Sequence, residues 1–358
     1  MKRRVIILGA GVTGAAIAYR LAKAGASVAV IDAATPGAGA SGRSFGWINA
    51  NFYADEDHFR LRMAGIAAYH RLTRDLGPGG VTWPGSLSWE EAGAAQEATA
   101  AALDALGYPV RRVGPAEFAK MEPAIAARPE SALYFPSEGV ADPGDLARRF
   151  LEAASGLGAQ FYFGLQATRL DLTGGAVTGV HTAMGKIAAH QVVVAAGTGS
   201  AALLSEVGVG LPMKYSPALI LSTNPVAPMI SRVLASPMLE IRQRADGRLL
   251  VPATAGHQRP DAPEMTTGPM EQADAALAYL RALLPTADLR WERVMRAERP
   301  IPKDGLPVVG ATAVPGLSVA VMHSGATLGP LIGELLADEV MGGPASALLA
   351  PYRPGRFA

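Results

Sequence analysis

A glycine-containing turn between two apolar segments constrains the fold of this chain more than any other feature. Residues 6–32 read IILGAGVTGAAIAYRLAKAGASVAVID. The apolar run Val5–Leu8 is typical of a strand that is buried on both faces of a parallel sheet. The pattern then predicts a helix over 13–24 and a second strand over 27–31. Strand, glycine turn, helix and strand in this order are typical of a dinucleotide-binding unit.

The three glycines of the turn each have a physical role. Gly9 allows the tight turn, Gly11 lets the backbone approach a pyrophosphate, and Gly14 lets the helix pack close to the strand. Asp32 follows the second strand, where its carboxylate can bind two ribose hydroxyls and would repel the 2′-phosphate of NADP. Such turns occur in NAD enzymes and in FAD enzymes. The residues expected at the nucleotide are Gly9, Gly11, Val12, Thr13, Gly14 and Asp32.

The composition excludes several classes of function. The chain has 358 residues, which predicts two domains, and its 32 Lys+Arg balance 31 Asp+Glu, so no basic field attracts nucleic acid. It has no cysteine and no apolar run long enough to predict a membrane span. The apolar run after MKRR is too short for a signal peptide, so we expect a cytoplasmic protein. We expect no metal site, because the histidines are scattered: His58, His70, His181, His190, His257 and His323.

Three later segments favour a long nucleotide ligand. Residues 36–51, PGAGASGRSFGWINAN, are too rich in glycine for a helix or a strand, and they offer small side chains and backbone donors. Residues 188–204 predict a buried strand that ends at Gly197-Thr198-Gly199. Residues 316–340 predict a strand, a Gly/Ser turn and an amphipathic helix. Each segment places a tight turn at a strand end, where nucleotides bind in such sheets.

With these motifs the chain resembles the FAD-dependent amino-acid oxidase superfamily, which includes D-amino-acid oxidase, glycine oxidase and sarcosine oxidase. The resemblance covers most of the chain. It rests on GAGVTGAAIAYRLAKAG, GASGRSFG, EGVADPGDLARRF, VVVAAGTGS, ERPIPKDGLPVVG and HSGATLGP. It implies FAD rather than NAD. Because the chain has no cysteine, the cysteinyl flavin link of some relatives is excluded, and we expect FAD to be bound non-covalently.

The resemblance also implies the fold class and the domains. It implies an α/β protein with a Rossmann-like FAD-binding domain of the glutathione-reductase type and an interleaved α+β substrate domain built on a mostly antiparallel sheet. The FAD-binding domain would comprise 1–84, 140–210 and 300–358. The substrate domain would comprise 85–139 and 211–299.

Further cofactor contacts are implied by position. The residues expected along the phosphates are Ser41, Gly42 and Arg43, and those approaching the flavin ring are Ser44, Phe45, Gly46 and Trp47. A strand over 161–167 that includes Ala167 would offer its backbone to the adenine. Ala196 and Gly197 are expected at the nucleotide. A helix start carries partial positive charge, and the one expected to face the N1–C2=O edge of the flavin comprises Gly325, Ala326, Thr327 and Leu328.

Two residues are expected to act on the substrate. Arg299 precedes Pro300, which favours extended backbone, and similar proteins hold the substrate carboxylate with an arginine here. His323 precedes the second glycine-rich helix start and is expected to orient the substrate or to titrate near neutral pH. Arg242 is a weaker candidate for the pocket, and Tyr215 is a candidate for its wall.

The resemblance therefore implies an FAD-dependent amino-acid oxidase or dehydrogenase. Its substrate would be a small amino acid, namely glycine, a D-amino acid or an N-substituted amino acid. The C–N bond would be oxidised by hydride transfer to flavin N5. Two alternatives remain at this point, namely a flavin-dependent 2-hydroxy acid dehydrogenase and a flavin-binding subunit of a larger dehydrogenase.

Overall fold

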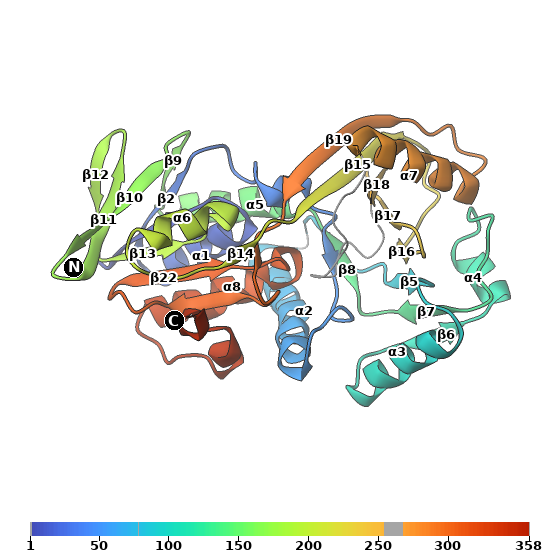
Figure 1. Cartoon of the computed structure of the whole chain (residues 1–358), viewed down its shortest axis with the longest axis horizontal. Helices are drawn as coiled ribbons and strands as arrows, with labels where there is room; N and C mark the ends of the chain where they lie inside the picture. Colours follow the sequence, from blue (N-terminus) through green and yellow to red (C-terminus); the bar gives the residue numbers. More distant parts are fainter. Residues whose placement is uncertain (1, 78, 254–267, 358) are drawn as a thin grey trace.

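The computed structural model describes residues 2–77, 79–253 and 268–357. His257, and with it part of the expected substrate domain, lies outside the described residues. Two large sheets lie side by side along the long axis of the molecule, and both termini lie beside the same one (Figure 1).

The sheet beside the termini is built mainly from parallel strands. Its strand order is β21-β22-β13-β1-β2-β9, and only β21 runs antiparallel to its neighbour. The strands are β1 (Arg4–Leu8), β2 (Ser27–Asp32), β9 (Gln160–Phe163), β13 (Gln191–Val194), β21 (Val308–Ala311) and β22 (Leu317–Val321). Val5–Leu8 is buried, since apolar layers cover both faces of the sheet. This confirms the predicted parallel sheet.

Helices cover one face of this sheet. α1 (Val12–Lys23) packs between α5 (Pro143–Gly156) and α8 (Gly325–Val340), and α2 (Glu56–Leu76) packs against α8. Small residues allow the close approach of α1 and α8, since a Cβ atom on Gly333 would lie 2.8 Å from the Cβ of Ala16. The other face carries the short helix α6 (Ser200–Ser205) and a small antiparallel sheet of β10 (Ala167–Thr173), β11 (Ala176–Thr182) and β12 (Gly185–Ala188).

The second large sheet is antiparallel except where β16 pairs with β5. Its order is β19-β15-β18-β17-β16-β5-β7-β6. The strands are β5 (Ser86–Ser88), β6 (Arg111–Val113), β7 (Ala132–Phe135), β15 (Pro217–Pro225), β16 (Val233–Ala235), β17 (Glu240–Gln243), β18 (Arg248–Pro252) and β19 (Trp291–Glu298). α4 (Pro115–Met121) and α7 (Pro269–Leu283) share a core with it, while α3 (Gly93–Ala105) packs into the core around α1. The α/β architecture with a mostly antiparallel second sheet is thus confirmed.

Short strands connect the two large sheets. β3 (Trp47–Ile48), β8 (Gly139–Ala141) and β4 (Val81–Thr82) form one small sheet, and β14 (Met213–Lys214) pairs with β20 (Ile301–Pro302).

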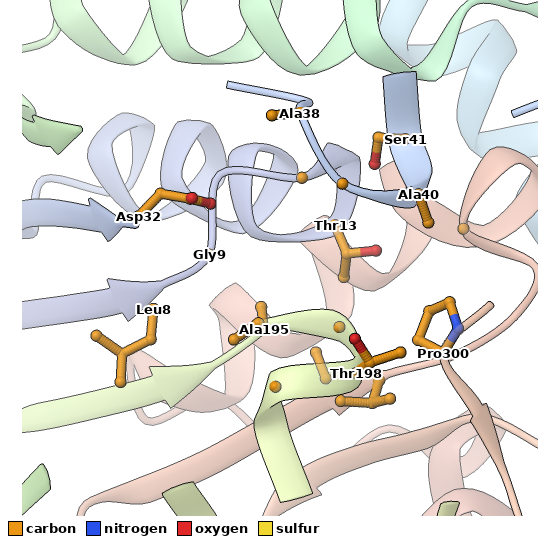
Figure 2. Close-up of a pocket in the computed structure, with 18 of the residues that line it drawn as sticks. Leu8, Gly9, Thr13, Asp32, Ala38, Ala40, Ser41, Ala195, Thr198 and Pro300 are labelled. Carbon is orange, nitrogen blue, oxygen red and sulfur yellow. The ribbon is translucent and has the colours of Figure 1, made fainter. Parts of the chain in front are cut away.

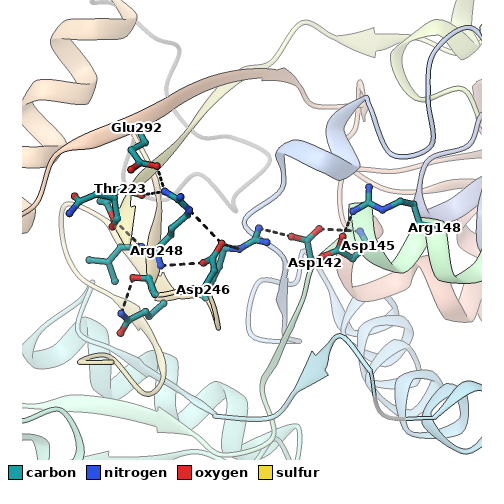
Figure 3. A network of polar contacts seen from close by, with 12 residues as sticks. Asp142, Asp145, Arg148, Thr223, Asp246, Arg248 and Glu292 are labelled. Atoms are coloured by element: carbon teal, nitrogen blue, oxygen red, sulfur yellow. Dashed lines mark hydrogen bonds and ion pairs between the residues drawn. The ribbon is translucent and has the colours of Figure 1, made fainter. Parts of the chain in front are cut away.

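A chain of charged side chains also joins the two halves (Figure 3). Asp142 caps the start of α5, where its Oδ1 accepts backbone hydrogen bonds from Gly144 and Asp145. Its Oδ2 pairs at 2.7 Å with Nη1 of Arg244, which follows β17. Asp246 lies 3.6 Å from the Arg244 guanidinium and continues the chain toward Arg248. The start of α5 is therefore tied to the antiparallel sheet.

Candidate functional site

A cavity of about 690 Å³ lies at the carboxyl ends of β1, β2 and β13. Thr13, Asp32 and Ser41 lie around it, and Thr198 and Pro300 border it on another side (Figure 2). The predicted residues that line it are Gly9, Gly11, Val12, Thr13, Asp32, Ser41, Arg43, Ser44, Ala167, Ala196, Gly197, His323, Gly325 and Ala326. Segments that are far apart in the sequence thus meet around one space of nucleotide size.

The turn between β1 and α1 is shaped to receive an anion. Gly9 has φ of +113°, and a Cβ atom there would lie 2.3 Å from the carbonyl oxygen of Ala195. Gly11 precedes α1, offers no side-chain cap, and is followed by a first turn without an acid. The backbone N–H of Val12 donates to Ser41 Oγ at 3.0 Å, which draws the 40–43 segment over the helix start. A helix start that has no acidic side chain of its own can bind a phosphate through its free backbone N–H groups and its partial positive charge.

Asp32 lines this cavity at the end of β2. Its Oδ2 accepts a hydrogen bond from the N–H of Ala10 at 2.6 Å, and its Oδ1 accepts one from Ala34 at 2.7 Å. Each carboxylate oxygen can accept a second hydrogen bond, so the side chain can accept hydrogen bonds from ribose hydroxyls. The same carboxylate also fixes the backbone of the turn.

The strand predicted over 161–167 is wrong in its bounds. The structure has two strands, because β9 ends at Phe163, Gly164 takes φ of +72°, and β10 begins at Ala167. Ala167 still lines the large cavity, together with Gln166 and Thr168.

Three of the predicted cofactor residues line neither of the two cavities described here. Gly14 packs against the β1 turn, where a Cβ atom would lie 2.1 Å from the Gly9 carbonyl oxygen. The N–H of Gly42 donates to the Gly37 carbonyl at 2.7 Å. Leu328 is fully buried in the core beneath α8. These three residues therefore pack behind the cavity lining and do not face the interior of the site.

A second cavity of about 70 Å³ adjoins the first and shares Arg43, Ser44 and His323 with it. Its predicted lining residues also include Phe45, Gly46, Trp47, Arg299, Ala326 and Thr327. Ala218, Ile220 and Ala297 contribute its wall from the antiparallel sheet. The structure therefore brings Arg299 and His323 together at one small space between the two sheets.

Arg299 is held in place by the chain segment before β15. Its backbone N–H donates to the Ser216 carbonyl at 3.0 Å, and its Nη2 donates to Ser216 Oγ at 2.5 Å. Burial lowers the pKa of the guanidinium and the carboxylate of Glu240 opposes that shift. An arginine remains protonated under these conditions. The site thus holds a fixed, largely buried positive charge.

Arg62 is a further charged residue of the small cavity that the sequence analysis missed. It lies on α2 and is 4% exposed. Its Nη1 donates to Ser324 Oγ at 2.7 Å, its Nε to the Asn49 carbonyl at 3.2 Å, and its Nη2 to Asn49 Oδ1. Its spacing in the sequence could have indicated burial, because Arg62 falls between Phe59 and Ile66 on the apolar face of the helix.

Glu138, also missed, lies fully buried behind the cavity wall. Its carboxylate accepts hydrogen bonds from Trp47 Nε1 at 2.8 Å, from the Tyr108 hydroxyl at 2.8 Å and from Ser86 Oγ. Desolvation raises the pKa of Glu138 to about 7, against the effect of these hydrogen bonds. This residue links the segment around Trp47 to elements of the antiparallel sheet.

Two weaker candidates lie outside both cavities. Arg242 is buried behind the loop that carries Phe45, and its Nε donates to the Phe45 carbonyl. Tyr215 is 66% exposed and bonds to Arg296, so the expectation that it forms the pocket wall is wrong.

The described residues offer neither a metal site nor a membrane-spanning helix. There, no three His, Cys, Asp or Glu side chains gather closely enough to hold a metal ion. None of the helices described for residues 2–77, 79–253 and 268–357 combines the length and the apolar run needed to cross a bilayer.

Comparisons with known proteins agree with this geometry. The family model of the FAD dependent oxidoreductases matches residues 4–339. The glycine oxidase of Geobacillus kaustophilus is 30% identical over 97% of this chain and 95% of its own. Its crystal structure covers 100% of both chains with a TM-score of 0.87 at 26% identity.

Two other similar proteins are also named as oxidases or dehydrogenases. A D-amino acid dehydrogenase of Neisseria gonorrhoeae is 28% identical over 68% of this chain and 59% of its own length. The crystal structure of an iminodiacetate oxidase from Chelativorans sp. BNC1 has a TM-score of 0.84 at 26% identity and covers 98% of this chain and 99% of its own.

Proposed function

Because the chain belongs to the family of FAD-dependent oxidoreductases, we propose that it oxidises the C–N bond of a small amino acid, namely glycine, a D-amino acid or an N-substituted amino acid. The names of three relatives support this class of substrate, since they are a glycine oxidase, a D-amino acid dehydrogenase and an iminodiacetate oxidase. The hydride would pass to N5 of a flavin that is bound as FAD.

The observation that carries the proposal is the charge of the small cavity beside the nucleotide-sized one. Its described lining includes Arg43, Arg62, Arg299 and His323 and no aspartate or glutamate. Such a lining favours a ligand with a carboxylate, and the planar fork of an arginine suits a bidentate pair with it. The volume of about 70 Å³ favours a small ligand.

The residues that line the large cavity suit the parts of FAD. The start of α1 and the start of α8 both line it, and neither helix has an acid in its first turn. The α1 end suits the phosphates, Asp32 suits the ribose, and the α8 end suits the electron-rich edge of the ring. FAD, when bound, supplies the hydride acceptor, while the protein supplies binding, orientation and electrostatics.

Side chains of the small cavity would bind the substrate, exchange protons with it and exclude water. Arg299 would hold the substrate carboxylate and thereby set the α-carbon against the ring, which contributes to binding and to orientation alike. His323 would orient the amine or exchange a proton with it, since an imidazole can both donate and accept a proton. Trp47 and Phe45, both buried, would exclude water from the reacting atoms.

An anaerobic screen tests this proposal. The purified protein is mixed with amino acids, N-methyl amino acids and 2-hydroxy acids, and bleaching of the flavin is followed before air is admitted. We expect bleaching by small amino acids. Bleaching by 2-hydroxy acids alone would favour a hydroxy acid dehydrogenase. Activity that appears only with a co-purified partner would favour a subunit of a larger dehydrogenase.

We also propose that the FAD-binding domain comprises 1–84, 140–210 and 300–358 and that the substrate domain comprises 85–139 and 211–299. We further propose that FAD is bound non-covalently, since the chain has no cysteine to link it, and that the protein is cytoplasmic. Acid precipitation tests the second of these proposals, because non-covalent FAD leaves the pellet and a histidyl link would keep it there.

A further inference from the structure

Arg62 is a buried cation at the wall of the small cavity without a matching acid. It is 4% exposed, and among the described residues its guanidinium bonds only to Asn49 and Ser324, neither of which is an acid. The acid that acts on it from farther away is Glu138, whose oxygens already accept hydrogen bonds from Trp47, Ser86 and Tyr108. An unpaired buried charge is costly, so a ligand that brings negative charge to this place would be stabilised.

The hydrogen bonds of Arg62 fix where its charge acts. Its guanidinium bridges Asn49, which follows β3, and Ser324, which precedes α8. These contacts use three of the five N–H groups of the fork. Arg62, Ser324, Ala326 and Thr327 line the same cavity. The full charge of Arg62 and the partial positive charge of the α8 start therefore act on one region.

We propose that Arg62 stabilises the negative charge that the bound flavin acquires on reduction. Transfer of one hydride, which is two electrons and one proton, adds one negative charge to the ring. The ring would lie against the start of α8 and the segment around Trp47, the two elements that Arg62 connects. This inference rests on the proposed function, and it assigns to Arg62 a role toward the cofactor rather than toward the substrate.

The competing role for Arg62 is that of a second anchor for a dicarboxylic substrate. The contacts of the two arginines separate these roles. Arg299 is held by Ser216 beside the antiparallel sheet, whereas Arg62 is held by the two segments expected at the flavin ring. The geometry therefore assigns the carboxylate to Arg299 and the charge of the reduced ring to Arg62.

The test compares four variants of the FAD-loaded protein. Arg62→Met removes the charge and Arg62→Lys keeps it without the fork. Arg60→Met is the matched control, because Arg60 lies on the same helix with its side chain 60% exposed and paired with Glu56 and Asp57. Arg299→Met removes the other buried guanidinium. The midpoint potential of the flavin is measured with a chemical reductant and a reference dye, and binding of acetate and malonate is measured by titration.

We expect Arg62→Met to lower the equilibrium constant for two-electron reduction tenfold or more, which is a fall in potential of about 30 mV. Arg62→Lys should retain most of the potential, and Arg60→Met should match the wild type. Arg299→Met should weaken acetate binding and leave the potential unchanged. Because reduction here is chemical, the potentials are read even if no amino acid proves to be a substrate.

An unchanged potential in Arg62→Met would overturn the proposal. A selective loss of malonate binding over acetate binding, without a shift in potential, would assign Arg62 to a second substrate carboxylate instead. If Arg62→Met does not retain FAD, Arg62→Gln takes its place. If neither neutral variant retains FAD, Arg62 is needed to hold the oxidised cofactor, and a role confined to the charge of the reduced ring is overturned.

Discussion

Trp47 Nε1 donates a 2.8 Å hydrogen bond to Glu138 Oε2, and both side chains are buried from solvent. Trp47 lines the small cavity, whereas Glu138 also accepts hydrogen bonds from Ser86 and Tyr108. The cavity wall is therefore held by a carboxylate that has three neutral donors, and the positive charge of the Arg62 guanidinium acts to lower the pKa of that carboxylate.

Glu138→Gln should change how stability depends on pH. Desolvation raises the pKa of folded Glu138 to about 7, above its ordinary value of 4.5. Between these values the folded state binds more protons than the unfolded state, so this group lowers the free energy of unfolding as pH rises through the window. In thermal unfolding from pH 4.5 to pH 8, the stability of the variant relative to the wild type should therefore increase as the pH rises. A difference that stays constant with pH would contradict the assignment.

Asp32→Ala should weaken FAD binding and also lower stability. The carboxylate accepts backbone hydrogen bonds from Ala10 and Ala34 and is expected to bind ribose hydroxyls. Charged hydrogen bonds contribute roughly 1.5–3 kcal/mol, so FAD affinity should fall about tenfold to a hundredfold. The FAD affinity of Asp32→Asn should lie between that of the wild type and that of Asp32→Ala. Fluorescence titration of the apoprotein measures this, and an unchanged Kd would show that Asp32 only shapes the turn.

Arg299→Ala should raise KM and lower kcat/KM by about tenfold or more, since roughly 1.5–3 kcal/mol of charged hydrogen bonding is lost. Arg299→Lys should recover only part of this, because a point charge cannot reproduce the fork. Arg293→Ala is the matched control, since Arg293 lies exposed on β19. FAD content should remain normal in all three variants. Loss of flavin from Arg299→Ala, or full kcat/KM, would exclude the role in substrate binding.

Asp142→Ala should cost more stability than Arg244→Met. The first change removes both the helix cap of α5 and the pair with Arg244, whereas the second removes that pair and the longer, 3.6 Å pair of Arg244 with Asp246 but leaves the cap in place. Loss of a cap costs about 0.5–2 kcal/mol, and a partly exposed ion pair contributes roughly 0.2–1 kcal/mol. A double-mutant cycle by thermal unfolding separates the two terms. Equal losses in both single variants would show that the cap contributes little.

The sequence predicted the elements whose signals are local. The glycine turn and the apolar run before it specify β1 and the start of α1, and the structure begins this helix at Val12 against the predicted residue 13. The strand predicted over 161–167 failed because a single glycine, Gly164, takes a positive φ and divides it. A window of apolar residues cannot show which glycine will form such a turn.

The buried polar residues could not be predicted in the same way. Arg62 meets Ser324 across 262 positions of the sequence, and Trp47 meets Glu138 across 91. Periodicity places Arg62 on the apolar face of its helix, but the roles of these residues depend on which distant segments the fold brings together. Arg299 and His323 were found through a family resemblance, and the fold places both at one small cavity.

The most direct test of the central claim is the amount of amine released when the flavin is reduced. The protein is mixed anaerobically with its best amino acid or with the 2-hydroxy analogue of that amino acid, and reduced flavin and released ammonia or amine are measured together. Removal of a hydride from the α-carbon of the neutral amine leaves an iminium ion, which water converts to an oxo acid and the protonated amine. Oxidation of a C–N bond therefore predicts equal molar amounts of reduced flavin and released amine, with little reduction by the hydroxy acid. Reduction by the hydroxy acid, or reduction without release of amine, would contradict it.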